Sequence, residues 1–183
     1  MLGLMNNKEG EIFQALELQE DLAALDYLYR RGISASLVFD RENYAVDLFD
    51  ILPHGGVAES DFSGLSHGVV TACFPSMPNG DLCEEAKKLS GNLNSTKRNL
   101  LLGMRNSDGA YSDEEIDLVE KFEIEHVAEF ANGVFSDLTR KSYFDLPADE
   151  AWKRDAIVLY WLRVRTVAIA ALAMADGVEE SSD

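Results

Sequence analysis

The chain has 183 residues, of which 46% are hydrophobic and 27% are charged, and it is long enough to bury a substantial core. The 16 Lys+Arg and 33 Asp+Glu residues give a formal net charge of −17, which disfavours nucleic acid and anionic membrane surfaces as partners and favours basic ones. The two cysteines match no disulfide framework or metal pattern, and residues 1–10 show no signal peptide, so we expect a reduced, cytoplasmic protein.

The N-terminal half of the chain predicts one helix followed by a small sheet. Apolar residues recur at helical spacing over residues 11–31. Strict alternation over residues 33–39 predicts a strand, whereas residues 44–52 are ambiguous between a second strand and a short helix. The Gly-, Ser- and His-containing stretch 53–68 predicts a long loop, and the β-branched run 69–74 predicts a buried strand.

The C-terminal half predicts three long helices. Asp81 is placed to cap the first, which carries an apolar seam over residues 82–100. Ser112 starts a capping box for a second helix that we expect to run unbroken to Leu138. The last helix is expected over residues 151–175, closed by a glycine at position 177.

These elements predict an α+β fold dominated by helices, with about four long helices and a small two- to three-stranded sheet from residues 33–75. Residues 1–177 are expected to form a single globular domain, and residues 178–183 a disordered acidic tail. The apolar stretch 156–175 is long enough to cross a bilayer, but Arg163 and Arg165 interrupt its middle. We therefore expect a buried helix of a globular protein.

Two glutamates, Glu120 and Glu123, fall on the apolar side of the predicted helix over residues 112–138 if each residue turns the helix by about 100°. A buried carboxylate is costly unless it meets a cation, a metal ion or a proton. Arg163 lies near the centre of the apolar last helix and can fork onto either carboxylate. We favour this buried ion pair over the alternative, in which Glu120 and Glu123 hold a divalent cation.

Segments of these last two helices are similar to the helical core of the all-α, MazG-like nucleotide pyrophosphohydrolases. The similar segments are Ile124-Glu-His-Val-Ala-Glu-Phe-Ala131 and Val167-Ala-Ile-Ala-Ala-Leu172. In that family a Glu-x-x-Glu helix faces a Glu-x-x-Asp helix around magnesium, and Glu120-Lys-Phe-Glu123 matches the first motif. The last helix contains no Glu-x-x-Asp, so the magnesium site that the resemblance implies would be incomplete, and the N-terminal half is left unexplained.

Other polar groups give weaker predictions. His54 and His67 lie beside glycines in the predicted loop and could form a metal or acid–base site, but their spacing matches no zinc motif, so we expect them at the loop surface. Cys73 lies in an apolar run and is expected in the core. Residues 86–107 contain no acid and are expected to dock against the acidic helix of this chain or of a second copy through Lys87, Lys88, Lys97, Arg98 and Arg105.

Two functions remain open from the sequence, which does not decide whether the chain is an enzyme or what its oligomeric state is. The favoured one is a non-catalytic protein-interaction module of the inhibitor or immunity type, without a cofactor, that binds a basic partner surface. The alternative is a magnesium-dependent nucleotide pyrophosphohydrolase-like core, possibly degenerate, with Glu120 and Glu123 as metal ligands.

Overall fold

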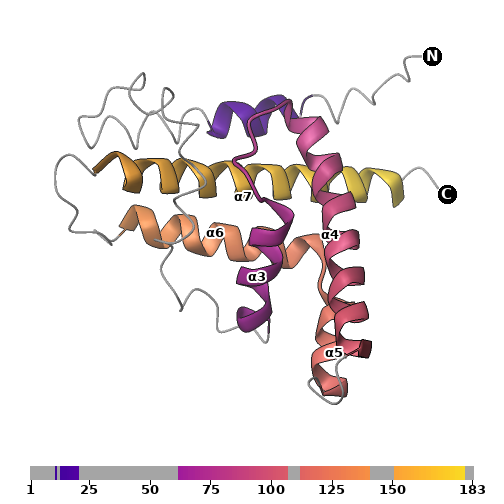
Figure 1. The fold of residues 1–183 in the computed structure, drawn as a ribbon. Helices are drawn as coiled ribbons and strands as arrows, with labels where there is room; N and C mark the ends of the chain where they lie inside the picture. The colour runs from indigo at the N-terminus through magenta and orange to yellow at the C-terminus, as the bar shows by residue number, and fades with distance from the viewer. Residues whose placement is uncertain (1–10, 12, 21–61, 107–111, 141–150, 180–183) are drawn as a thin grey trace.

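The computed structural model describes residues 11, 13–20, 62–106, 112–140 and 151–179, and every structural statement below concerns these residues (Figure 1). A helical segment over residues 13–20 precedes five further helices. These are α3 (Ser63–Cys73), α4 (Leu82–Asn106), α5 (Asp113–Lys121), α6 (Ile124–Arg140) and α7 (Ala151–Glu179).

The predicted α+β fold is wrong for the part of the chain that the structure describes, because that part contains no strand. Residues 69–73 of the run 69–74, expected as a strand, belong to α3, and Phe74 directly follows this helix, which begins inside the segment expected as a loop. Its buried residues Ser66, Val69, Val70 and Cys73 recur at helical spacing, whereas a six-residue apolar run read alone fits a buried strand or a buried helix equally well. The strand predicted at 33–39 and the segment 44–52, which is ambiguous between a strand and a short helix, lie outside the described residues.

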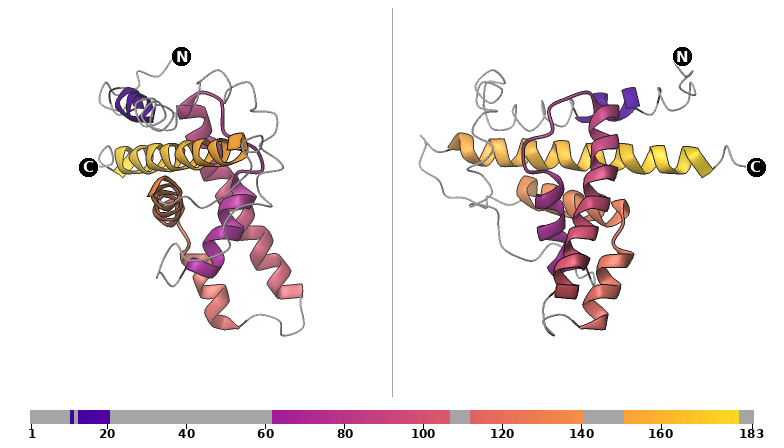
Figure 2. Two further views of the ribbon diagram at one scale, coloured as in Figure 1. Left: turned by 90° about the vertical axis from the view of Figure 1, so that its left-hand side faces the viewer. Right: turned by 45° about the vertical axis from the view of Figure 1, so that its right-hand side comes forward.

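Helix α7 is the centre of the fold (Figures 1 and 2). It lies between the segment 13–20 on one side and α6 on the other, while α3 and α4 cross this stack. The stretch Ala156–Gly177 within α7 is long and apolar enough to cross a membrane by length and composition, but 67% of its apolar 18-residue window is buried inside the protein. Such burial is what a core helix of a globular protein requires.

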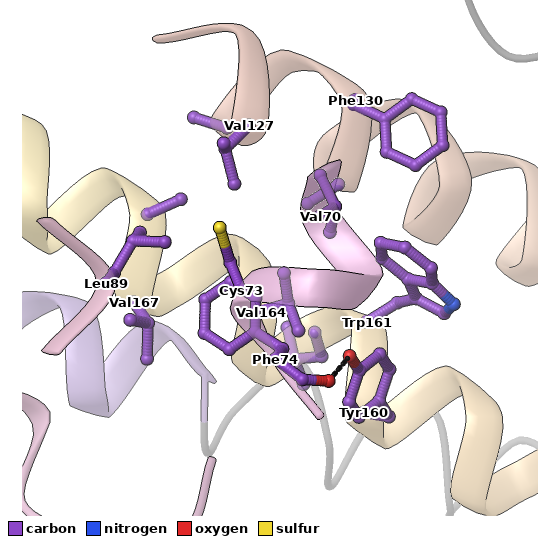
Figure 3. Packing of buried hydrophobic residues seen from close by; sticks show 14 of the residues in the cluster. Val70, Cys73, Phe74, Leu89, Val127, Phe130, Tyr160, Trp161, Val164 and Val167 are labelled. Atoms are coloured by element: carbon purple, nitrogen blue, oxygen red, sulfur yellow. Dashed lines mark hydrogen bonds between the residues drawn. The ribbon is translucent and has the colours of Figure 1, made fainter. Parts of the chain in front are cut away.

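The core forms where α3 meets α4, α6 and α7 (Figure 3). Cys73 and Phe74 at the end of α3 pack among Leu89 of α4 and the valines of α7, and Trp161 meets Phe130 of α6 edge to face at 5.7 Å. The buried Tyr160 hydroxyl donates a hydrogen bond to the Phe74 carbonyl oxygen at 3.0 Å. This bond satisfies a carbonyl that α3 leaves unpaired at its C-terminal end.

The predicted helix starts are confirmed, and the predicted ends are less accurate. The Asp81 carboxylate accepts from the Glu84 amide at 3.1 Å, and Ser112 forms a complete capping box with Glu115. Helix α7 continues through Glu179, past the predicted stop at position 177, so the first two residues of the predicted tail are helical. Residues 180–183 lie outside the described part of the chain.

The C-terminal half of α4 and the whole of α5 project beyond α6 (Figures 1 and 2). Helix α5 packs on α4, and its Val119 is buried. We call residues 94–106 and 113–121 together the arm. The arm exposes many polar side chains to solvent, and most of the hydrophobic core lies among the remaining helices.

Candidate functional site

The predicted helix over residues 112–138 is two helices, and the break between them defines the candidate site. Phe122 closes α5 with extended backbone (φ −73°, ψ 122°), and α6 begins at Ile124. In an unbroken helix, Phe122 would lie about 120° from the direction of Ile116 and Val134. The break turns the Phe122 side chain into the core, where it is fully buried, and leaves Glu120 and Glu123 exposed.

Lys97 of α4 holds this break in place. Its Nζ donates to the carbonyl oxygens of Glu120 at 2.8 Å and Phe122 at 2.7 Å, and it lies 3.3 Å from Glu123 Oε1. The last carbonyls of a helix lack partners within the helix and carry partial negative charge, so an ammonium group suits them well. Because the Lys97 side chain is only 16% exposed, these contacts tie the arm to the start of α6.

His126 completes the junction from the other side. Its Nδ1 accepts a hydrogen bond from the Glu123 backbone amide at 2.9 Å, which satisfies a free donor at the start of α6. The imidazole packs against the Phe62 ring at 4.0 Å and the Phe122 ring at 5.3 Å between centroids. His126 therefore acts as a helix cap and an aromatic packing residue, and the beginning of α3 is joined to the same junction through Phe62.

The predicted contact between Arg163 and the glutamate pair is wrong. Arg163 Nη1 donates to Glu20 Oε2 at 2.7 Å, and its Nη2 donates to the Gly80 carbonyl oxygen at 2.6 Å. Glu123 instead faces Lys97, and its side chain is 66% exposed. The prediction failed because it assumed one continuous helix, which would have aimed both glutamates at the core.

Arg163 is nevertheless the cation of a mostly buried ion pair, as the sequence predicted. The Arg163 and Glu20 side chains are 13% and 15% exposed. This pair joins α7 to the helical segment 13–20, and the hydrogen bond to Gly80 joins both to the start of α4. Glu20 lies in the segment that the sequence predicted as helical, but its charge partner could not be identified from spacing alone.

An acidic surface follows the break on both sides. Between residues 113 and 129, Lys121 is the single Lys or Arg, and it pairs with Asp117 at 2.6 Å. Every carboxylate residue of this stretch is exposed. We call this set the acidic surface: Asp113, Glu114, Glu115, Asp117, Glu120, Glu123, Glu125 and Glu129.

The basic stretch of α4 divides into paired and unpaired cations. Lys97 contacts the acidic helices of its own chain, which is one of the two predicted arrangements; the other was docking on a second copy. Lys88 pairs with Glu84 and Glu85 on α4 itself. Arg98 and Arg105 are exposed and form no ion pair with a described residue. Lys87, near the start of α4, is also exposed without such a pair, whereas Arg98 and Arg105 lie on the arm, close to a strongly acidic helix.

The remaining candidate residues show no shared site within the described chain. His67 lies on α3 with its ring 6.2 Å from that of Phe130, and His54 lies outside the described residues. Burial raises the pKa of the Cys73 thiol, although its hydrogen bond to Thr96 opposes this effect, so Cys73 is a core thiol as predicted. Among the described residues, no three His, Cys, Asp or Glu side chains are grouped so that they could hold a metal ion.

The sequence did not reveal the role of Phe122, and Lys97 was named only as one of five cations, without its role at the junction. One signal was present: Phe122 falls off the apolar face of the long predicted helix while two glutamates fall on it. A break in the helix at this point changes the direction of the side chains on one side of it relative to those on the other, so that Phe122 can enter the core and the two glutamates can face solvent.

Comparison of the chain with protein-family models, curated proteins and solved structures found no match in any of the three.

Proposed function

We propose that the protein is a non-catalytic interaction module that binds a basic surface on a protein partner through the acidic surface. The observation that carries this proposal is the exposed run of carboxylates on α5 and the first half of α6, in a chain of net charge −17. A field of one sign speeds the encounter with an oppositely charged partner and disfavours other partners. Small inhibitors and immunity-type proteins work in this way.

The geometry of the junction supports this proposal. A binding surface is more effective when its charges are held in place before the partner arrives, because less ordering is needed on binding. Contacts of Lys97, Phe122 and His126 join the arm to the start of α6. The two free thiols, one buried and one half-buried, support the further proposal of a reducing, cytoplasmic location.

A basic amphipathic peptide is a suitable probe for the acidic surface. Its affinity for the wild-type protein should fall steeply between low and high salt, because exposed charges are screened over about 8 Å at physiological ionic strength. The variant Glu114→Gln/Glu125→Gln should weaken binding, whereas Glu11→Gln/Glu17→Gln removes the same charge from exposed positions of the N-terminal helical segment and should not. Equal affinities for both variants, or indifference to salt, would remove the basis for this proposal.

The alternative nucleotide hydrolase receives less support from the geometry. Its motif requires Glu120 and Glu123 on one helical face, but the break at Phe122 separates them, and Lys97 contacts Glu123. A thermal-shift measurement with magnesium or manganese and nucleoside triphosphates discriminates between the two functions. Stabilisation by metal and nucleotide together, lost in Glu123→Gln, would favour the hydrolase.

A further inference from the structure

The exposed side of α4 carries a basic stripe. Six residues of α4 lie within about 40° of one direction and recur at steps of three and four, the spacing of a seam between paired helices. All six are exposed: Lys87, Gly91, Asn94, Arg98, Leu102 and Arg105. Gly91 leaves open space where a Cβ would stand, so a second helix could approach closely there.

Two features of the basic stripe favour a binding role. Leu102 is 48% exposed and lies between Arg98 and Arg105, so an apolar group is flanked by two cations. Neither arginine pairs with a described carboxylate, although the chain has twice as many acids as bases. An apolar anchor with a charged rim is the usual composition of a protein-binding patch, and these charges fit an acidic partner.

The arm itself presents the complementary surface. Asp113, Asp117 and Glu120 lie within about 60° of one another on α5, and all three are exposed. Arg98 and Arg105 are seven residues apart on α4, as are Asp113 and Glu120 on α5. Both pairs are therefore separated by about 10.5 Å along their helix axes. The half-buried Ile116 lies between the two acids, as Leu102 lies between the two arginines.

We propose that the basic stripe binds α5 of a second copy of this chain, and that two arms associate about a two-fold axis. Each copy then contributes Arg98 and Arg105 to one contact and Asp113 and Glu120 to the other, as an isologous interface requires. Leu102 of each copy packs near Ile116 of the other. This inference does not rest on the proposed function, but the two compete, because α5 belongs to the acidic surface.

Salt has two opposing effects on such a dimer. Two chains of charge −17 repel each other, but at 0.15 M ionic strength the Debye length of about 8 Å screens most of this repulsion. Contacts between the basic stripe of one copy and α5 of the other are shorter than that length and persist. Near 1 M salt the Debye length of about 3 Å weakens the contacts as well. Dimerisation should therefore be strongest near physiological salt.

Reciprocal charge reversal tests the proposal directly. Sedimentation equilibrium at 0.15 M salt should show a concentration-dependent dimer of the wild-type chain. Arg98→Glu/Arg105→Glu and Asp113→Lys/Glu120→Lys should each weaken self-association at least about tenfold, because like charges then face each other. An equimolar mixture of the two variants should dimerise again, since both contacts regain opposite charges. Circular dichroism and thermal melts establish that each variant is folded.

A matched pair of leucines tests the apolar part of the interface. Leu102→Ala should weaken the dimer about tenfold through lost apolar burial. Leu18→Ala alters the other large exposed apolar side chain among the described residues, 60% exposed on the segment 13–20 against 48% for Leu102, and should leave dimerisation unchanged. A monomeric wild-type chain, a dimer indifferent to both charge reversals, or a mixture that stays monomeric would each overturn the proposal.

Discussion

Replacing Lys97 with methionine tests whether a single ammonium group holds the arm to the core. Methionine keeps most of the apolar stem, so the substitution removes mainly the contacts of Nζ. The two carbonyl hydrogen bonds, at 2.8 and 2.7 Å, should each contribute about 1–1.5 kcal/mol because the donor is charged. The ion pair with the exposed Glu123 carboxylate adds no more than about 0.5 kcal/mol.

The expected loss in the free energy of unfolding is therefore about 2–3 kcal/mol for Lys97→Met. Urea unfolding followed by circular dichroism measures it, and the melting temperature should fall by about 4–10 °C for a chain of this size. Lys87→Met, an exposed lysine on the same helix, is the matched control and should cost less than about 0.5 kcal/mol. Indistinguishable values for the two variants would refute the role assigned to Lys97.

Three further predictions concern other parts of the fold. Arg163→Met should destabilise the protein by about 2–4 kcal/mol in urea unfolding, because it removes the ion pair with the mostly buried Glu20 carboxylate and the hydrogen bond to the Gly80 carbonyl, whereas Glu123→Gln should cost less than about 0.5 kcal/mol. Ser112→Ala should cost about 1 kcal/mol by thermal melting through loss of the capping box, and no loss would show that α5 does not depend on it. Burial raises the pKa of Tyr160 and of Cys73, so their contribution to stability is present near neutral pH and is lost as the pH rises above about 9, where the unfolded chain begins to release these protons. Unfolding midpoints measured from pH 7 to 10.5 should fall less steeply for Tyr160→Phe than for the wild type.

Local signals in the sequence predicted the helices of the second half well. Asp81 and Ser112 mark helix starts through short-range hydrogen bonds, and the leucine spacing of α4 identifies its buried side. The strand predicted at 69–74 failed for a physical reason. Val69 and Val70 favour strands when exposed on one face, but here the surrounding helices bury them on a helical face, and tertiary packing overrides such preferences.

The candidate site was harder to predict because it depends on contacts that are distant in sequence. Glu120 and Glu123 face the core only if the helix is continuous, and the break that leaves them exposed is held by Lys97, more than twenty residues earlier. Arg163 was recognised as a cation in need of a partner, and its carboxylate is that of Glu20, 143 residues away. Periodicity measures the direction of a side chain around one helix and contains no information on which other helix lies opposite.

The two-residue joint at Phe122 and Glu123 determines the direction in which the arm projects, independently of how α6 packs in the core. Because Phe122 has extended backbone, a residue inserted at this joint would change the direction of α5 relative to α6 while leaving the buried face of α6 in register. Variation in the length of this joint could therefore redirect the charged end of the molecule without repacking its interior. Related chains that share the core and differ at this position would be expected to point their acids toward different targets.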